Sequence, residues 1–211
     1  MTPPLLNISI SGCLLGEHVR YDGGHKYQPK LISALKKHAH LYSFCPEVNA
    51  KLGVPRPAVQ LITVGDSIKA RGKRDTTLDV TAALTSAGTE WGRRVTALKL
   101  EGVISKAKSP SCGNGSTPLK GQGITTDGLA ISALKKQQLP IVLIEDTALL
   151  TNLSCKRFVT ACHLAREFRR CGRLLKATLL EANLPIYLAN HTHWPSLFEQ
   201  HLKPWISAEP T

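Results

Sequence analysis

The amino-acid sequence predicts an α/β fold in which a parallel sheet is layered between helices. Four short apolar runs alternate with segments of helical pattern, and strands that alternate with helices pair in parallel through right-handed crossovers. The chain has 211 residues, of which 42% are hydrophobic, and this length supplies the core of one globular domain. After about residue 150 the alternation ends and the pattern is helical throughout. We therefore expect a Rossmann-like sheet with helices on both faces, followed by a helical C-terminal extension.

Each predicted strand is a short run of apolar residues between polar residues, glycines or prolines. The runs occupy residues 5–11, 40–45, 102–107 and 140–145.

The segments between these runs have the apolar spacing of amphipathic helices. Residues 30–38 place leucines and alanine on one face and lysines on the other. A longer helix precedes the third strand and ends near Lys99, with Asp79 or Thr81 as its expected N-cap. Asp127 is the expected cap of the helix that precedes the fourth strand.

Three cysteines lie directly after predicted strands, in the segments "SGCLLGE", "FCPEV" and "SPSCGNG". They are Cys13, Cys45 and Cys112. Ligand sites in open α/β sheets lie beyond the carboxyl ends of the strands, so these three residues are expected to converge on one edge. Three thiolates at such short separation would repel one another unless a cation were bound between them. This favours a metal centre over a lone reactive cysteine. The alternative is that the cysteines only fill buried space.

The spacing of the cysteines bears on the kind of metal centre. Structural zinc normally takes four ligands, commonly from CxxC pairs, and the sequence contains no CxxC. An iron–sulfur cubane accepts thiolates from separated loops, normally four of them, and three ligands would leave one iron open to water or substrate. The other cysteines, Cys155, Cys162 and Cys171, lie on a predicted helix, where a packing role is expected.

Polar residues accompany the cysteine loops. Glu47 lies two residues after Cys45 and is a candidate acid–base group, or alternatively a capping or ion-pairing residue. Ser109 and Ser111 flank the third cysteine loop, where they can donate to a sulfide or substrate or merely close the turn.

The net charge of +12 suggests an anionic partner. Between residues 155 and 176 seven Lys or Arg residues accompany one acid, so RNA binding by this basic segment is a hypothesis beside that of a solvated helix face. No apolar run approaches the roughly 20 residues of a membrane span, and the N-terminus lacks a signal-peptide pattern. We expect a cytoplasmic protein that does not interact with membranes.

Three segments resemble the signature blocks of the bacterial DUF523 family, which includes the thiouracil desulfidases. The segments are "SGCLLGEHVRYDGGHK", "FCPEVNAKLGVPRPAVQL" and "GVISKAKSPSCGNGS". The resemblance covers roughly residues 6–147 and implies a desulfidase domain over residues 1–150, with residues 151–211 as a basic helical extension.

The resemblance implies a [4Fe-4S] cluster held by Cys13, Cys45 and Cys112 only. It also implies Glu47 as the acid–base group and Ser109 as its catalytic partner in a hydrolytic reaction without net electron transfer. The expected substrate is a small thiolated pyrimidine such as 2-thiouracil, and the expected products are the oxo base and hydrosulfide. Alternatives are desulfuration of thiolated tRNA nucleosides, a non-catalytic metal- or RNA-binding module, and electron transfer.

Overall fold

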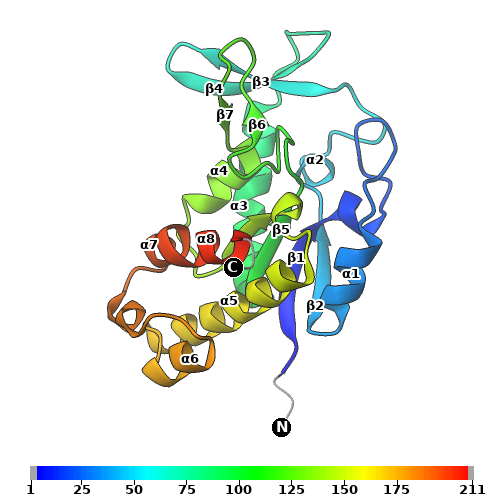
Figure 1. Ribbon diagram of the computed structural model, residues 1–211. Coiled ribbons are helices and arrows are strands. Elements are labelled where there is room, and N and C mark those ends of the chain that lie inside the picture. Colours follow the sequence, from blue (N-terminus) through cyan, green and yellow to red (C-terminus); the bar gives the residue numbers. More distant parts are fainter. Residues whose placement is uncertain (1–3, 209–211) are drawn as a thin grey trace.

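The computed structural model describes residues 4–208 and places a four-stranded parallel sheet at its centre (Figure 1). The strand order is β2–β1–β5–β8, and all three neighbouring pairs are parallel. The strands are β1 (Leu6–Ser11), β2 (Ala39–Phe44), β5 (Gly102–Ser105) and β8 (Val142–Glu145). The predicted α/β fold with a parallel sheet is confirmed.

Helices cover both faces of this sheet. On one face lie α1 (Pro29–Lys36) and α5 (Asn152–Cys171), which share a hydrophobic core with Ile8 and Ile10 of β1. On the other face lie α3 (Thr81–Ala97) and α4 (Leu129–Lys135), which pack around Val103 of β5. Alternate residues of a strand point to opposite faces, so these apolar strands bury side chains on both sides, as three-layer packing requires.

The helices that follow residue 150 are part of the same core. Phe158 and Cys162 of α5 are fully buried, and each has an atom 2.8 Å from where a Cβ on Gly102 would lie. Only a glycine in β5 permits this close approach. Further along, Trp194 donates from Nε1 to the carbonyl of Ile141 at 2.7 Å. The C-terminal helices therefore pack directly on the sheet and its connections. After α5 they are α6 (Lys176–Glu181), α7 (Trp194–Leu197), a π-helical turn (Phe198–Leu202) and α8 (Lys203–Ser207).

Two hairpins lie together beyond one end of the sheet (Figure 1). The first joins β3 (Val59–Val64) and β4 (Ser67–Gly72), and the second joins β6 (Thr117–Pro118) and β7 (Thr125–Thr126). A bridge between Leu61 and Leu119 connects them. The base of the first hairpin forms one wall of the cavity described below, through Ala58, Val59 and Lys73.

The N-terminus of α4 differs from the expectation that Asp127 caps it. The Asp127 carboxylate instead accepts hydrogen bonds from Lys135 Nζ at 2.9 Å. Backbone carbonyls of Pro110 and Ser111 accept the first N–H groups of the helix. A Cβ on Gly128 would lie 2.6 Å from the Ser111 carbonyl carbon, so the cysteine loop presses against the helix start and takes the place of a side-chain cap. By contrast, Asp79 accepts the N–H of Thr81 at the start of α3.

Among the described helices, none combines the length and the apolar character that a membrane crossing needs.

We predict that Phe158→Ala lowers the free energy of unfolding by about 3–5 kcal/mol, because it opens a cavity between α5 and the sheet. Urea unfolding followed by circular dichroism measures the change. Leu180→Ala on α6 is the matched control, since Leu180 is 62% exposed and its loss should cost about 0.5 kcal/mol or less. Equal effects of the two substitutions would contradict a core shared by α5 and the sheet.

Candidate functional site

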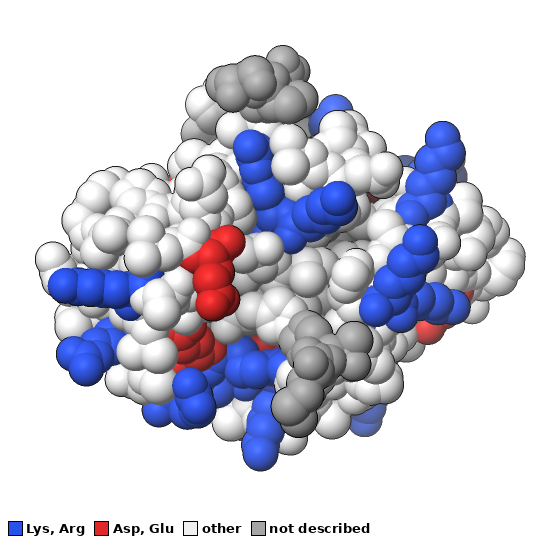
Figure 2. All heavy atoms as spheres, turned by 60° about the horizontal axis from the view of Figure 1, so that its bottom comes forward, with Lys and Arg blue, Asp and Glu red and all other residues white. Residues whose placement is uncertain are grey.

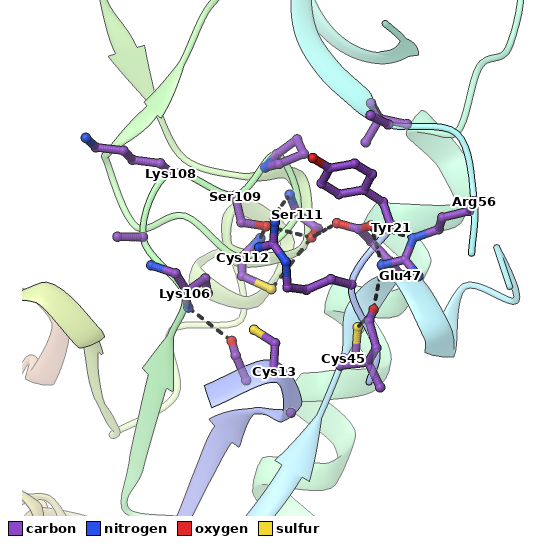
Figure 3. Close-up of a pocket in the computed structure, with 18 of the residues that line it drawn as sticks. Cys13, Tyr21, Cys45, Glu47, Arg56, Lys106, Lys108, Ser109, Ser111 and Cys112 are labelled. Atoms are coloured by element: carbon purple, nitrogen blue, oxygen red, sulfur yellow. Dashed lines mark hydrogen bonds and ion pairs between the residues drawn. The ribbon is translucent and has the colours of Figure 1, made fainter. Parts of the chain in front are cut away.

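A cavity of about 190 Å³ opens at the carboxyl edge of the sheet, and Cys13, Cys45 and Cys112 all line it (Figure 3). Cys13 lies in the 3₁₀ turn Gly12–Leu15 after β1, and Cys45 lies between β2 and the short helix α2 (Pro46–Asn49). Cys112 lies in the loop after β5. The structure thus brings together the three cysteines that the sequence placed at strand ends.

The first two cysteines are held by tight local turns. The carbonyl of Cys13 accepts the N–H of Lys26 at 2.8 Å, which folds the following loop back over the strand end. Cys45 is the N-cap of α2 with extended backbone, and Pro46 at the first helical position has the fixed φ that starts a helix.

The third cysteine is held by the side chain of Ser109. Ser109 Oγ accepts the N–H of Cys112 at 3.1 Å and that of Ser111 at 3.3 Å. The carbonyl of Ser109 accepts the N–H of Gly113 at 2.8 Å. Ser109 thereby closes the turn that presents the Cys112 thiol, which is one of the two roles weighed for it from the sequence.

Burial and mutual repulsion both disfavour thiolates in this cavity. The pKa of Cys13 is raised to about 11, mainly by desolvation and to a smaller extent by electrostatic repulsion from Cys45. Burial also raises the pKa of Cys45, and the pKa of Cys112 rises further because that thiol is fully buried beside the other two. Three thiolates are stable here only with a bound cationic group, whose binding must release protons.

The donor set fits a group with several metal atoms better than a single ion. Within residues 4–208, no three His, Cys, Asp or Glu side chains are close enough to hold one metal ion. The three sulfurs nevertheless face one cavity, and soft thiolates are the ligands of iron–sulfur clusters. A closed structural zinc site requires a fourth ligand, but Cys155 and Cys162 are buried in the helical core and Cys171 is exposed.

Glu47 lines the same cavity and is fixed by Arg56. Oε2 of Glu47 accepts from Arg56 Nε at 2.7 Å and lies 2.6 Å from Nη2. The side chain of Glu47 is only 12% exposed and that of Arg56 only 4%. Arg56 also donates to the carbonyls of Gly53 and Val19, so its guanidinium is held from several sides. Charge-assisted hydrogen bonds of this kind fix the orientation of a carboxylate.

Ser111 connects Glu47 to the third cysteine loop. Its hydroxyl donates to Oε1 of Glu47 at 2.7 Å and lies 3.0 Å from Oγ of Ser109 (Figure 3). The structure therefore brings Glu47 and Ser109, the two predicted catalytic residues, into one hydrogen-bonded chain with Ser111 between them.

Lys106 forms the opposite wall of the cavity. Its Nζ pairs with the carboxylate of Asp146 at 3.0 Å, and Asp146 is 2% exposed. The N–H of Ala107 donates to the same carboxylate at 2.8 Å. A buried carboxylate thus holds the segment that leads from β5 into the cysteine loop.

Arg56 and Lys106 were not identified from the sequence. Arg56 lies between two prolines in a segment with no periodic pattern, and Lys106 falls at the end of the predicted third strand. Both residues lie within segments that carry a cysteine, and a charged residue inside such a segment was the available signal.

The basic C-terminal segment contributes part of its charge to internal contacts. Arg166 pairs with Glu101 at 3.0 Å, while Arg157 and Arg169 donate to backbone carbonyls. Figure 2 shows basic side chains in several small groups over the face where α6 lies, with acidic and uncharged surface between the groups.

Comparison with known proteins finds relatives that match more than half of this chain. A curated relative, the Bacillus subtilis (strain 168) protein named "Uncharacterized protein YbbK", is 29% identical over an alignment of 147 residues. The match covers 61% of this chain and 89% of that protein. A solved structure of the [4Fe-4S]-dependent thiouracil desulfidase TudS is similar with a TM-score of 0.57 and 28% identity. The match covers 68% of this chain and 93% of that one.

The family model described as 2-thiouracil desulfurase matches residues 8–146, a range that includes the three cavity cysteines, Glu47 and Ser109. Because this match covers well over half of the sequence, the chain belongs to the 2-thiouracil desulfurase family.

Proposed function

We propose that this protein is a [4Fe-4S]-dependent desulfidase that converts 2-thiouracil, or a similar thiolated pyrimidine, into the oxo base and hydrosulfide. The observation that carries the proposal is the convergence of three cysteines and the Glu47–Ser111–Ser109 chain on one cavity. Membership of the 2-thiouracil desulfurase family and the likeness to TudS support the same activity.

Cys13, Cys45 and Cys112 would hold the cluster. When bound, it supplies a Lewis-acidic iron that has no cysteine ligand and has affinity for the soft sulfur of a thiocarbonyl. The cytoplasm, where thiols remain reduced, is the proposed location.

Side chains of the protein accept and donate the protons that this reaction transfers. Water replaces sulfur at the ring carbon, so protons must leave the attacking water and the sulfur must leave as hydrosulfide, without net electron transfer. Glu47 is the proposed acid–base group, because Arg56 holds Oε2 and leaves Oε1 directed toward the serine pair. Ser109 is its proposed partner near the reacting atoms, since its oxygen lies beside Cys112 and the cavity.

A free base or small nucleoside is the proposed substrate class. The cavity is small, and three of the seven basic residues in the 155–176 segment already bind internal acceptors. Phosphate-backbone binding depends on many basic groups on one surface, whereas on the face in Figure 2 acidic and uncharged side chains separate the basic groups. Thiolated tRNA remains the alternative substrate that an assay must include.

Anaerobic reconstitution with iron and sulfide tests the proposed function. We expect the reconstituted protein to remove the thiocarbonyl absorption of 2-thiouracil and to release one hydrosulfide per molecule converted. A protein with a stable cluster that acts only on thiolated tRNA would contradict the proposed substrate, and one that acts on neither would contradict the activity.

In the same experiment Cys112→Ala should lose bound iron and activity, because a ligand is removed. Cys171→Ala, at an exposed position outside the cavity, should retain both. Undiminished iron binding by Cys112→Ala would contradict the assigned ligand set.

Glu47→Gln should lower kcat by about 10²- to 10⁴-fold, the range that general acid–base catalysis contributes, while iron content stays normal. The amide keeps the shape of the side chain but cannot exchange a proton in the same way. Glu90→Gln on the exposed face of α3 is the matched control and should behave as the wild type. A fully active Glu47→Gln would show that another group exchanges the proton.

A further inference from the structure

We propose that Ser111 is a positioning residue that relays protons between Ser109 and Glu47. This inference rests on the proposed function and deepens it. Ser111 is 1% exposed and lies between the two residues, with oxygen–oxygen distances of 2.7 Å to Glu47 and 3.0 Å to Ser109.

The number of donors and acceptors determines which hydroxyl donates to which oxygen in the hydrogen-bonded series Ser109–Ser111–Glu47. An ionised carboxylate only accepts, so the single hydroxyl hydrogen of Ser111 is directed to Oε1 of Glu47. Ser111 Oγ must then be the acceptor in its contact with Ser109, whose hydroxyl hydrogen is the donor. The Cys112 thiol, 3.6 Å from Ser111 Oγ, is the other possible donor, and it loses that hydrogen when it becomes a thiolate ligand.

Ser109 is suited to be the outer end of this relay. Its oxygen accepts two backbone N–H groups, from Cys112 and Ser111, and these stabilise negative charge that develops on it. At the inner end, Arg56 occupies Oε2 of Glu47, so Oε1 is the oxygen that faces Ser111. With Cys112 as a thiolate ligand, Ser111 therefore has Ser109 as its hydroxyl donor and Glu47 as its acceptor.

The relay moves protons without any change in electrons. The attacking water replaces the longer of the two backbone hydrogen bonds to Ser109 Oγ, that from the N–H of Ser111 at 3.3 Å. It then gives a proton to Ser109 as Ser109 gives its own to Ser111, and Ser111 gives its own to Oε1 of Glu47. Three O–H bonds break and three form, and Glu47 ends as the neutral acid. The reverse sequence returns the proton for the departing sulfur. Ser111 exchanges one proton for another and does not touch the substrate.

Ser111→Ala tests the relay, because it removes one oxygen and interrupts the chain. We expect kcat to fall by about 10²-fold, the lower end of the range for general acid–base catalysis, with little change in KM or in iron content. The dependence of kcat on the fraction of heavy water should be curved in the wild type, where several protons move together, and linear in the variant. Ser111→Thr keeps the hydroxyl and should recover most of kcat.

A second measurement needs neither cluster nor turnover. In the metal-free protein, infrared difference spectra against Glu47→Gln identify the carboxylate stretch of Glu47, and Ser111→Ala should shift it as the hydroxyl donor is lost. Ser105→Ala is the matched control, since Ser105 is also fully buried but donates only to the carbonyl of Ile144. It should change neither the stretch nor kcat.

The outcomes separate the relay from the function on which it rests. An active wild type with an undiminished kcat in Ser111→Ala, or with an unshifted Glu47 stretch, overturns the relay alone. A wild type that holds its cluster yet releases no sulfide from any thiolated substrate overturns the proposed function, and the relay with it.

Discussion

Parallel pairing of β2, β1 and β5 is the constraint on which the site depends. Ser11 of β1 lies opposite Phe44 of β2, and Ile10 lies opposite Ile104 of β5, so the three strands end at nearly the same level. A cysteine placed just beyond each strand end must then approach the other two. The order of the strands reverses between β1 and β5, and this is the point at which open α/β sheets bind ligands.

The sheet keeps this geometry because both of its faces are buried. Trp91 of α3 packs on one face and donates to Ser9 of β1 at 2.9 Å, while Phe158 of α5 packs on the other. The C-terminal helices therefore contribute to the platform from which the cysteine loops extend, although every proposed site residue precedes them. Rigid elements that carry short functional loops are a common way to position reactive groups.

The sequence predicts those parts of the site whose positions follow from the direction of the strands, namely the three cysteines. Cys13, Cys45 and Cys112 follow apolar runs, and their convergence needs only the rule that parallel strands end at one edge. The contact between Glu47 and Arg56 depends instead on how an irregular, proline-containing loop folds back, and no periodic pattern encodes that. Asp127 was wrongly expected to cap α4, because the acceptors come from the cysteine loop, a tertiary contact that local capping rules do not include.

Mössbauer spectroscopy of the protein reconstituted with ⁵⁷Fe tests the central claim most directly, namely that three cysteines hold a four-iron cluster. The account predicts three similar irons and one distinct iron, and a change in the signal of the distinct iron alone when 2-thiouracil is added. Four equivalent irons that do not respond to 2-thiouracil would contradict it.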